Sequence, residues 1–210
     1  EIGLFAIATE TLEETLTLRN TVRGKEHIFL GIGFHPWQHQ PSLDAAQKEK
    51  MRELLVDKNI YIGEVGIDNS ALHRHDLNDQ CRLLDQIIEL WSETDSAIVI
   101  HNVGASHLLL QRQHHLRDRK VLLHQFVGSD QDALRMNGLG LYAGINPSNL
   151  QHWIKRNHFS HFDPQRIVIE SDKFLTVNAF ELFTQKVLAL AKKSGVSLHP
   201  ARSFLGLYSE

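Results

Sequence analysis

The sequence has little cysteine, no long apolar run and no excess of positive charge. Its 210 residues include one cysteine, Cys81, so no intrachain disulfide can form and a reducing, cytoplasmic location is expected. No apolar stretch approaches the length of a transmembrane helix, so we expect no membrane partner. The formal net charge of -3 excludes a strongly basic surface field, although a metal ion can still attract a nucleic acid.

The remaining composition is that of an ordinary globular protein, with 42% hydrophobic and 22% charged residues. A chain of this length can bury one sizeable core, so residues 1–210 are predicted to form a single domain. Because the first residue is Glu1 and not methionine, we expect this domain to be incomplete at its N-terminus.

Apolar runs alternate with segments of helical periodicity along the whole chain. The runs predicted to form strands are residues 3–8, 28–34, 60–64, 97–101, 120–124, 139–145 and 166–170. The intervening segments include an amphipathic pattern from Leu77 to Trp91, a helix over 105–113 and one that Pro147 opens. Repeated βα units of this kind predict an α/β fold with a parallel sheet.

Two parallel architectures fit this pattern. A (β/α)8 TIM-like barrel needs eight strands to close, so the chain would lack the first strand of the barrel. An open doubly wound sheet accommodates seven strands with no missing piece. The pattern alone leaves both open, and we favour the barrel.

Four residues of metal-binding type lie at or just after strand ends. Glu64 ends the third run, His101 the fourth and His124 the fifth, and Asp172 follows the seventh. The carboxyl ends of barrel strands meet at the active-site face, and carboxylates and imidazoles bind divalent ions. An unpaired carboxylate at a buried strand end also loses its hydration, so a cation is expected beside Glu64. The sequence therefore predicts a metal site.

Each of these residues also has an ordinary structural explanation. Glu64 can cap the turn that follows it or pair with Arg74. His101 and His124 can be strand-end histidines with hydrogen-bond partners. Asp172 can cap the next helix, which is a common use of aspartate. The occurrence of all four together favours the functional interpretation.

Five short motifs occur in a distinctive order. They are Gly33-Phe34-His35-Pro36-Trp37, Ile62-Gly63-Glu64-Val65-Gly66-Ile67-Asp68, Ile100-His101 through Ala105, His124-Gln125-Phe126-Val127-Gly128-Ser129, and Ile169-Glu170-Ser171-Asp172. In order and approximate spacing they resemble the TatD family of metal-dependent deoxyribonucleases, which are amidohydrolase-like TIM-barrel hydrolases. The similarity extends from about Gly31 to Phe204-Leu205-Gly206-Leu207.

The resemblance implies a set of site residues. Glu64, His101, His124 and Asp172 would be metal ligands for two divalent ions (Mg, Zn or Mn), with Glu64 shared between the ions. Glu64 and Asp172 would be the catalytic residues, since Asp172 would help to activate the attacking water. His35 would line the site and touch a phosphate of the substrate.

The chain departs from the family pattern at three places. The His-x-His pair of the family's first strand is absent, so one of the two metal sites is expected to be incomplete in this chain. Asn102-Val103-Gly104 stands where the family commonly has Ser-Arg and an acidic or polar residue. Lys173-Phe174 replaces the usual Ala-Pro. We expect Arg74, or else Lys173, to supply the missing positive charge to the substrate.

The function implied by the resemblance is metal-assisted hydrolysis of DNA or another phosphodiester, without an obligate protein partner. Two alternatives remain. The protein can be a catalytically impaired barrel that acts as a binding subunit, or a related hydrolase that acts on an amide or ester. Fold alone does not decide between them.

Overall fold

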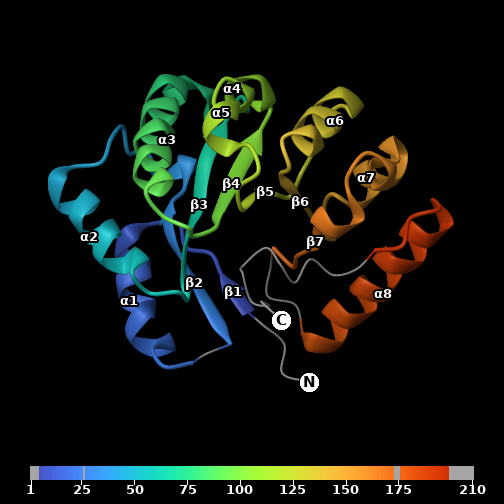
Figure 1. Ribbon diagram of the computed structural model, residues 1–210, viewed down its shortest axis with the longest axis horizontal. Helices are drawn as coiled ribbons and strands as arrows, with labels where there is room; N and C mark the ends of the chain where they lie inside the picture. Colours follow the sequence, from blue (N-terminus) through green and yellow to red (C-terminus); the bar gives the residue numbers. More distant parts are fainter. Residues whose placement is uncertain (1–4, 26, 173–175, 199–210) are drawn as a thin grey trace. The chain divides into compact units, whose positions relative to one another are not determined.

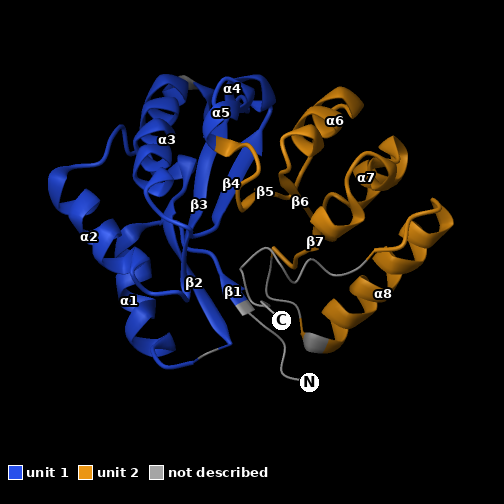
Figure 2. Cartoon of the chain, viewed as in Figure 1, with its two compact units in different colours: residues 1–115 blue, residues 116–210 orange. Residues whose placement is uncertain are grey.

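The computed structural model describes residues 5–25, 27–172 and 176–198 (Figure 1). The chain divides into two compact units, residues 1–115 and 116–210 (Figure 2). The assignment of residues 1–210 to one hydrolase domain stays a prediction. Lys173 and the C-terminal run from Phe204 to Leu207 lie outside the described residues.

The first unit contains four parallel strands, β1 (Phe5–Ile7), β2 (Ile28–Phe34), β3 (Ile60–Asp68) and β4 (Ile98–Val103). The strands are hydrogen-bonded in chain order, β1-β2-β3-β4. A doubly wound sheet reverses its strand order at a switch point, so this order favours the barrel arrangement. The helices of the unit are α1 (Leu12–Val22), η1 (Pro36–Gln38), α2 (Ala45–Leu55), η2 (Arg74–Asp76), α3 (Leu77–Ser92), α4 (Ser106–Leu110) and α5 (Gln113–Leu116).

The second unit continues the βα pattern. Its parallel strands are β5 (Val121–His124), β6 (Tyr142–Ile145) and β7 (Ile167–Ile169), again in chain order. Its helices are α6 (Asp130–Gly138), α7 (Leu150–Arg156), η3 (His158–Ser160), η4 (Pro164–Arg166) and α8 (Val177–Lys193). All seven predicted strands are therefore confirmed, with changes at their ends.

The largest change concerns the third strand. Its predicted end at Glu64 is wrong, because β3 runs on to Asp68. The register against β2 shifts between Ile62 and Val65, which marks a bulge at Glu64. Beyond it, Gly66 (φ +148) lets the strand approach β4, since a Cβ there would lie 2.0 Å from the carbonyl oxygen of His101. Glu64 is thus the one residue of β3 that is not fully buried.

The predicted helices are confirmed less evenly. The amphipathic segment forms α3, and its Leu84, Ile87, Ile88 and Trp91 are buried. The predicted helix over 105–113 is wrong as one element, since it is divided into α4 and α5.

Pro147 does not open a helix. The side chain of Asn146 accepts the backbone N–H groups of Ser148 and Asn149, so Pro147 lies in a turn and α7 begins at Leu150. The sixth strand starts at Tyr142 and not at residue 139, because α6 extends to Gly138. In the part of the chain that the structure describes, no helix has the length and apolarity needed to cross a bilayer.

Candidate metal centre

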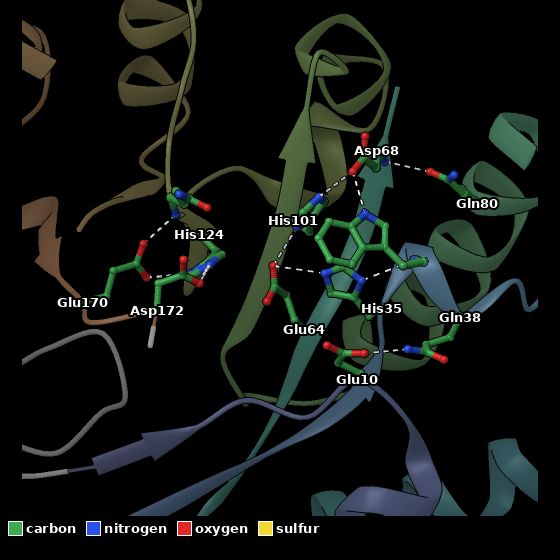
Figure 3. Close-up of polar contacts among 12 residues, drawn as sticks. Glu10, His35, Gln38, Glu64, Asp68, Gln80, His101, His124, Glu170 and Asp172 are labelled. Atoms are coloured by element: carbon green, nitrogen blue, oxygen red, sulfur yellow. Dashed lines mark hydrogen bonds and ion pairs between the residues drawn. The ribbon is translucent and has the colours of Figure 1, made fainter. Parts of the chain in front are cut away.

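In the first unit, the imidazole of His101 lies between two carboxylates (Figure 3). Its Nδ1 is 2.9 Å from Oε1 of Glu64, and its Nε2 is 3.3 Å from Oδ2 of Asp68. His101 projects from β4, whereas both carboxylates belong to β3. A neutral imidazole donates a hydrogen bond from one nitrogen only. One of the two contacts therefore needs a second proton or a bound cation.

Asp68 is held as an ionised carboxylate beside Nε2 of His101. Its carboxylate accepts hydrogen bonds from the indole Nε1 of Trp37 (2.7 Å) and from the backbone N–H of Ser70 (2.8 Å). Burial acts to raise the pKa of Asp68, but the hydrogen bonds from Ser70, Trp37 and His101 outweigh it and lower the pKa to about 2. In the tautomer in which Nε2–H of His101 donates to the ionised Asp68, the Nδ1 lone pair faces Glu64 and is open to a cation.

His35 approaches Glu64 from the loop after β2. Its Nε2 lies 3.7 Å from Oε1 of Glu64, and its Nδ1 accepts the backbone N–H of Trp37 at 3.3 Å. Because Nδ1 is an acceptor, neutral His35 carries its proton on Nε2. The ligand atoms of His35, Glu64 and His101 all lie within 4.8 Å of one another. His35 is therefore suited to donate to a substrate oxygen, and Glu64 and His101 are suited to hold an ion.

These donors fit a divalent cation. A carboxylate oxygen that faces an imidazole lone pair in a largely buried site is repelled unless a proton or a metal ion lies between them. Histidine ligands commonly donate their other N–H to a carboxylate, as His101 does to Asp68. The pair Glu64 and His101 thus has the form of part of a metal coordination shell.

The second unit repeats this arrangement around His124, the last residue of β5 (Figure 3). Its Nδ1 is 2.9 Å from Oε2 of Glu170, and its Nε2 is 2.9 Å from Oδ1 of Asp172. Glu170 also accepts the backbone N–H of Gln125 and fits against Gly144, where a Cβ would lie 2.2 Å from Oε1. Glu170 contacts Nδ1 of the ring, so Nε2 of His124 is the atom that faces Asp172.

The ordinary explanation for Asp172 does not hold, because Thr176 and not Asp172 caps α8. In the turn after β3, Asp68 accepts the N–H of Ser70.

Arg74 is exposed in η2, and its role in substrate binding stays a prediction. The neighbouring His73 stacks on Trp37, with ring centroids 5.0 Å apart. The sequence interpretation gave no role to Asp68 or Glu170. Both lie in the motifs that carry the family resemblance. Their position in these motifs was the sequence feature that could have marked them as site residues.

Comparison with known proteins decides the family. The chain matches the model of TatD related DNases over residues 2–201. It belongs to the TatD family. A relative from Haemophilus influenzae, described as an uncharacterized metal-dependent hydrolase, is 23% identical over 207 residues, with 91% of this chain and 79% of the relative covered. This TatD protein is thus a metal-dependent hydrolase.

Solved structures show the fold. The TatD homologue YJJV of Escherichia coli K12 has a TM-score of 0.74 at 18% identity, with 98% of this chain and 83% of that chain covered. An uncharacterized amidohydrolase of Saccharomyces cerevisiae has a TM-score of 0.66 at 15% identity, with 89% and 70% covered. The predicted α/β fold of the TatD barrels is confirmed, and the seven described strands agree with a barrel that lacks its first strand.

Proposed function

We propose that this TatD protein hydrolyses phosphodiester bonds of DNA with bound divalent ions. The observation that carries the proposal is the arrangement of His101, whose Nε2 contacts the ionised Asp68 while its Nδ1 is turned toward Glu64. The description of the matching family as TatD related DNases supports DNA as the substrate.

In this proposal Glu64, His101, His124 and Asp172 are the metal ligands, and Asp68 and Glu170 orient the two histidines. Two ions are proposed, although none of the described strands carries the His-x-His pair that would complete one of the two sites. The mixed carboxylate and imidazole donors suit zinc or manganese better than magnesium, which prefers oxygen ligands.

Bound divalent ions would lower the pKa of a water molecule and neutralise charge on the phosphate oxygens. The protein's own groups supply the remaining chemistry. Nε2–H of His35 donates to a phosphate oxygen beside Glu64. Asp172 accepts a proton from the attacking water. Trp37 is 51% exposed, and its ring centroid lies 4.7 Å from that of His35, so its exposed edge can contact the substrate beside the phosphate.

A substrate panel tests this proposal. Purified protein is incubated with Mn²⁺ and single-stranded DNA, a small ester or a small amide, each with and without EDTA. Cleavage of DNA that EDTA abolishes is the expected result. Cleavage of the ester or amide alone would replace the proposal with the related-hydrolase alternative. Metal binding without turnover of any substrate would favour a binding subunit.

A further inference from the structure

The second unit holds a group of metal-binding side chains that the centre described above does not use. Asp130 begins α6, His158 begins η3, and His161 follows η3. Their ligand atoms lie within 4.8 Å of one another. None of them takes part in the contacts of His124 with Glu170 and Asp172. We propose that Asp130, His158 and His161 bind a structural zinc ion that ties the start of α6 to the turn after α7.

The orientation of His158 is that of a metal ligand. Its side chain is fully buried, and its Nε2 lies 3.2 Å from the carbonyl oxygen of Gly128. Since a carbonyl oxygen only accepts, this contact favours a proton on Nε2 and a lone pair on Nδ1. A ligating histidine commonly donates its second N–H to a backbone carbonyl in this way. Nε2 of His152 lies 2.9 Å from the same oxygen and 3.1 Å from Nε2 of His158, so the two rings share this carbonyl.

Nδ1 of His158 points at His161. The two Nδ1 atoms are 3.3 Å apart. In a tetrahedral zinc site with Zn–N bonds of about 2.0–2.1 Å, neighbouring nitrogens are roughly 3.3–3.4 Å apart. The separation of the two rings therefore already matches one edge of a zinc tetrahedron.

Asp130 supplies the third ligand from the solvent side. Its carboxylate is half exposed and lies 3.7 Å from Nη1 of Arg156, which is also half exposed. An exposed ion pair of this length is weak, so the carboxylate is free to turn toward the histidines. Two imidazole nitrogens, one carboxylate oxygen and a water would complete the four ligands that zinc takes. The ion can enter the site from the solvent on the side of Asp130.

Zinc content measured on the full chain tests this site. The protein is equilibrated with Zn²⁺, freed of loose metal and analysed by mass spectrometry of the elements. The variants are His161→Ala and Asp130→Asn, and the control is His115→Ala, which removes an exposed histidine of α5. We expect His161→Ala and Asp130→Asn each to hold one zinc ion fewer per chain than the wild type and the control.

Zinc content is also measured for the same variants in a Glu64→Gln background. This separates the proposed site from the candidate metal centre, because the zinc lost through Glu64→Gln and the zinc lost through His161→Ala or Asp130→Asn should add. With Co²⁺ in place of Zn²⁺, the visible absorption of a tetrahedral site should weaken in both variants. Equal zinc content in the wild type and both variants would overturn the proposal. A loss in His161→Ala with none in Asp130→Asn would overturn the three-ligand site. If circular dichroism shows that His161→Ala does not fold, the zinc content of Asp130→Asn, which changes an exposed side chain, tests the proposal.

Discussion

Oδ2 of Asp68 lies 3.3 Å from Nε2 of His101, while Nδ1 of the same ring faces Glu64. Asp68 therefore contacts the candidate metal centre without being one of its proposed ligands. Its hydrogen bond from the indole of Trp37 (2.7 Å) holds the carboxylate in place. The chemistry of Glu64 and His101 thus depends on residues from the loop after β2 and from the end of β3.

Replacing Asp68 tests this dependence. In Asp68→Asn, the amide can donate to Nε2 of His101, which would move the ring proton to Nδ1 and block the lone pair that faces Glu64. We expect the affinity for Zn²⁺ or Mn²⁺ at this centre to fall about 10–100-fold. Titration calorimetry measures it. The control is Asp79→Asn, which removes a surface carboxylate paired with Arg82. An unchanged affinity in Asp68→Asn would contradict the orienting role.

His35 should contribute to substrate binding and not to metal binding. Because Nδ1 of His35 accepts the N–H of Trp37, its Nε2–H remains a donor toward the site. In His35→Ala, the loss of a hydrogen bond to a charged phosphate should lower kcat/KM about 10–100-fold. The metal content should stay at the wild-type level. Loss of a metal ion in this variant would show that His35 is a ligand.

Two glycines of the second unit offer a matched comparison. A Cβ at Gly144 would lie 2.2 Å from Oε1 of Glu170, whereas a Cβ at Gly138 would meet nothing within 4 Å. Gly144→Ala should displace Glu170 from His124 and reduce metal-dependent activity. Gly138→Ala should leave activity unchanged and raise the free energy of unfolding by about 0.4–1 kcal/mol. Metal-dependent activity and urea unfolding are measured for both variants. Equal activity in the two variants would argue against the role of Glu170.

The buried His158 should make stability depend on pH. Burial, together with the nearby His152, lowers its pKa from the usual 6.5 to about 4. As the pH falls, the unfolded chain takes up the proton before the folded chain does. The stability contributed by neutral His158 is therefore complete above pH 6.5 and is lost between pH 6.5 and pH 4.

The expected loss from this residue is about 2 kcal/mol between pH 7 and pH 5. Urea unfolding in the presence of EDTA measures it, with His158→Gln as the comparison, since glutamine can still donate to the carbonyl of Gly128. The wild type should lose more stability than the variant over this interval. Parallel pH profiles would show that His158 titrates normally in the folded protein.

The strands could be predicted from the sequence because each is a short apolar run between turn signals. The end of β3 could not, because its continuation past Glu64 depends on the close contact of Gly66 with His101 in β4. The division of the helix over 105–113 into α4 and α5 was likewise not visible in the apolar pattern.

The candidate ligands could also be predicted, since carboxylates and histidines at strand ends are visible in the sequence. The roles of Asp68 and Glu170 could not, because their contacts with His101 and His124 join residues 33 and 46 positions apart. The group around His158 was missed for the same reason. Only the short spacing from His158 to His161 hinted at it, and Asp130 lies far upstream in the sequence.

The central claim is that Glu64 and His101 form part of a metal centre that hydrolyses phosphodiester bonds. The most direct measurement is the rate of Mn²⁺-dependent cleavage of single-stranded DNA by the wild type and by Glu64→Gln. The control is Glu89→Gln, which removes an exposed carboxylate of α3. We predict a loss of roughly 100-fold or more in Glu64→Gln, because a bound metal contributes several kcal/mol to such a reaction, and a wild-type rate in Glu89→Gln. Cleavage by Glu64→Gln at the wild-type rate would contradict the claim.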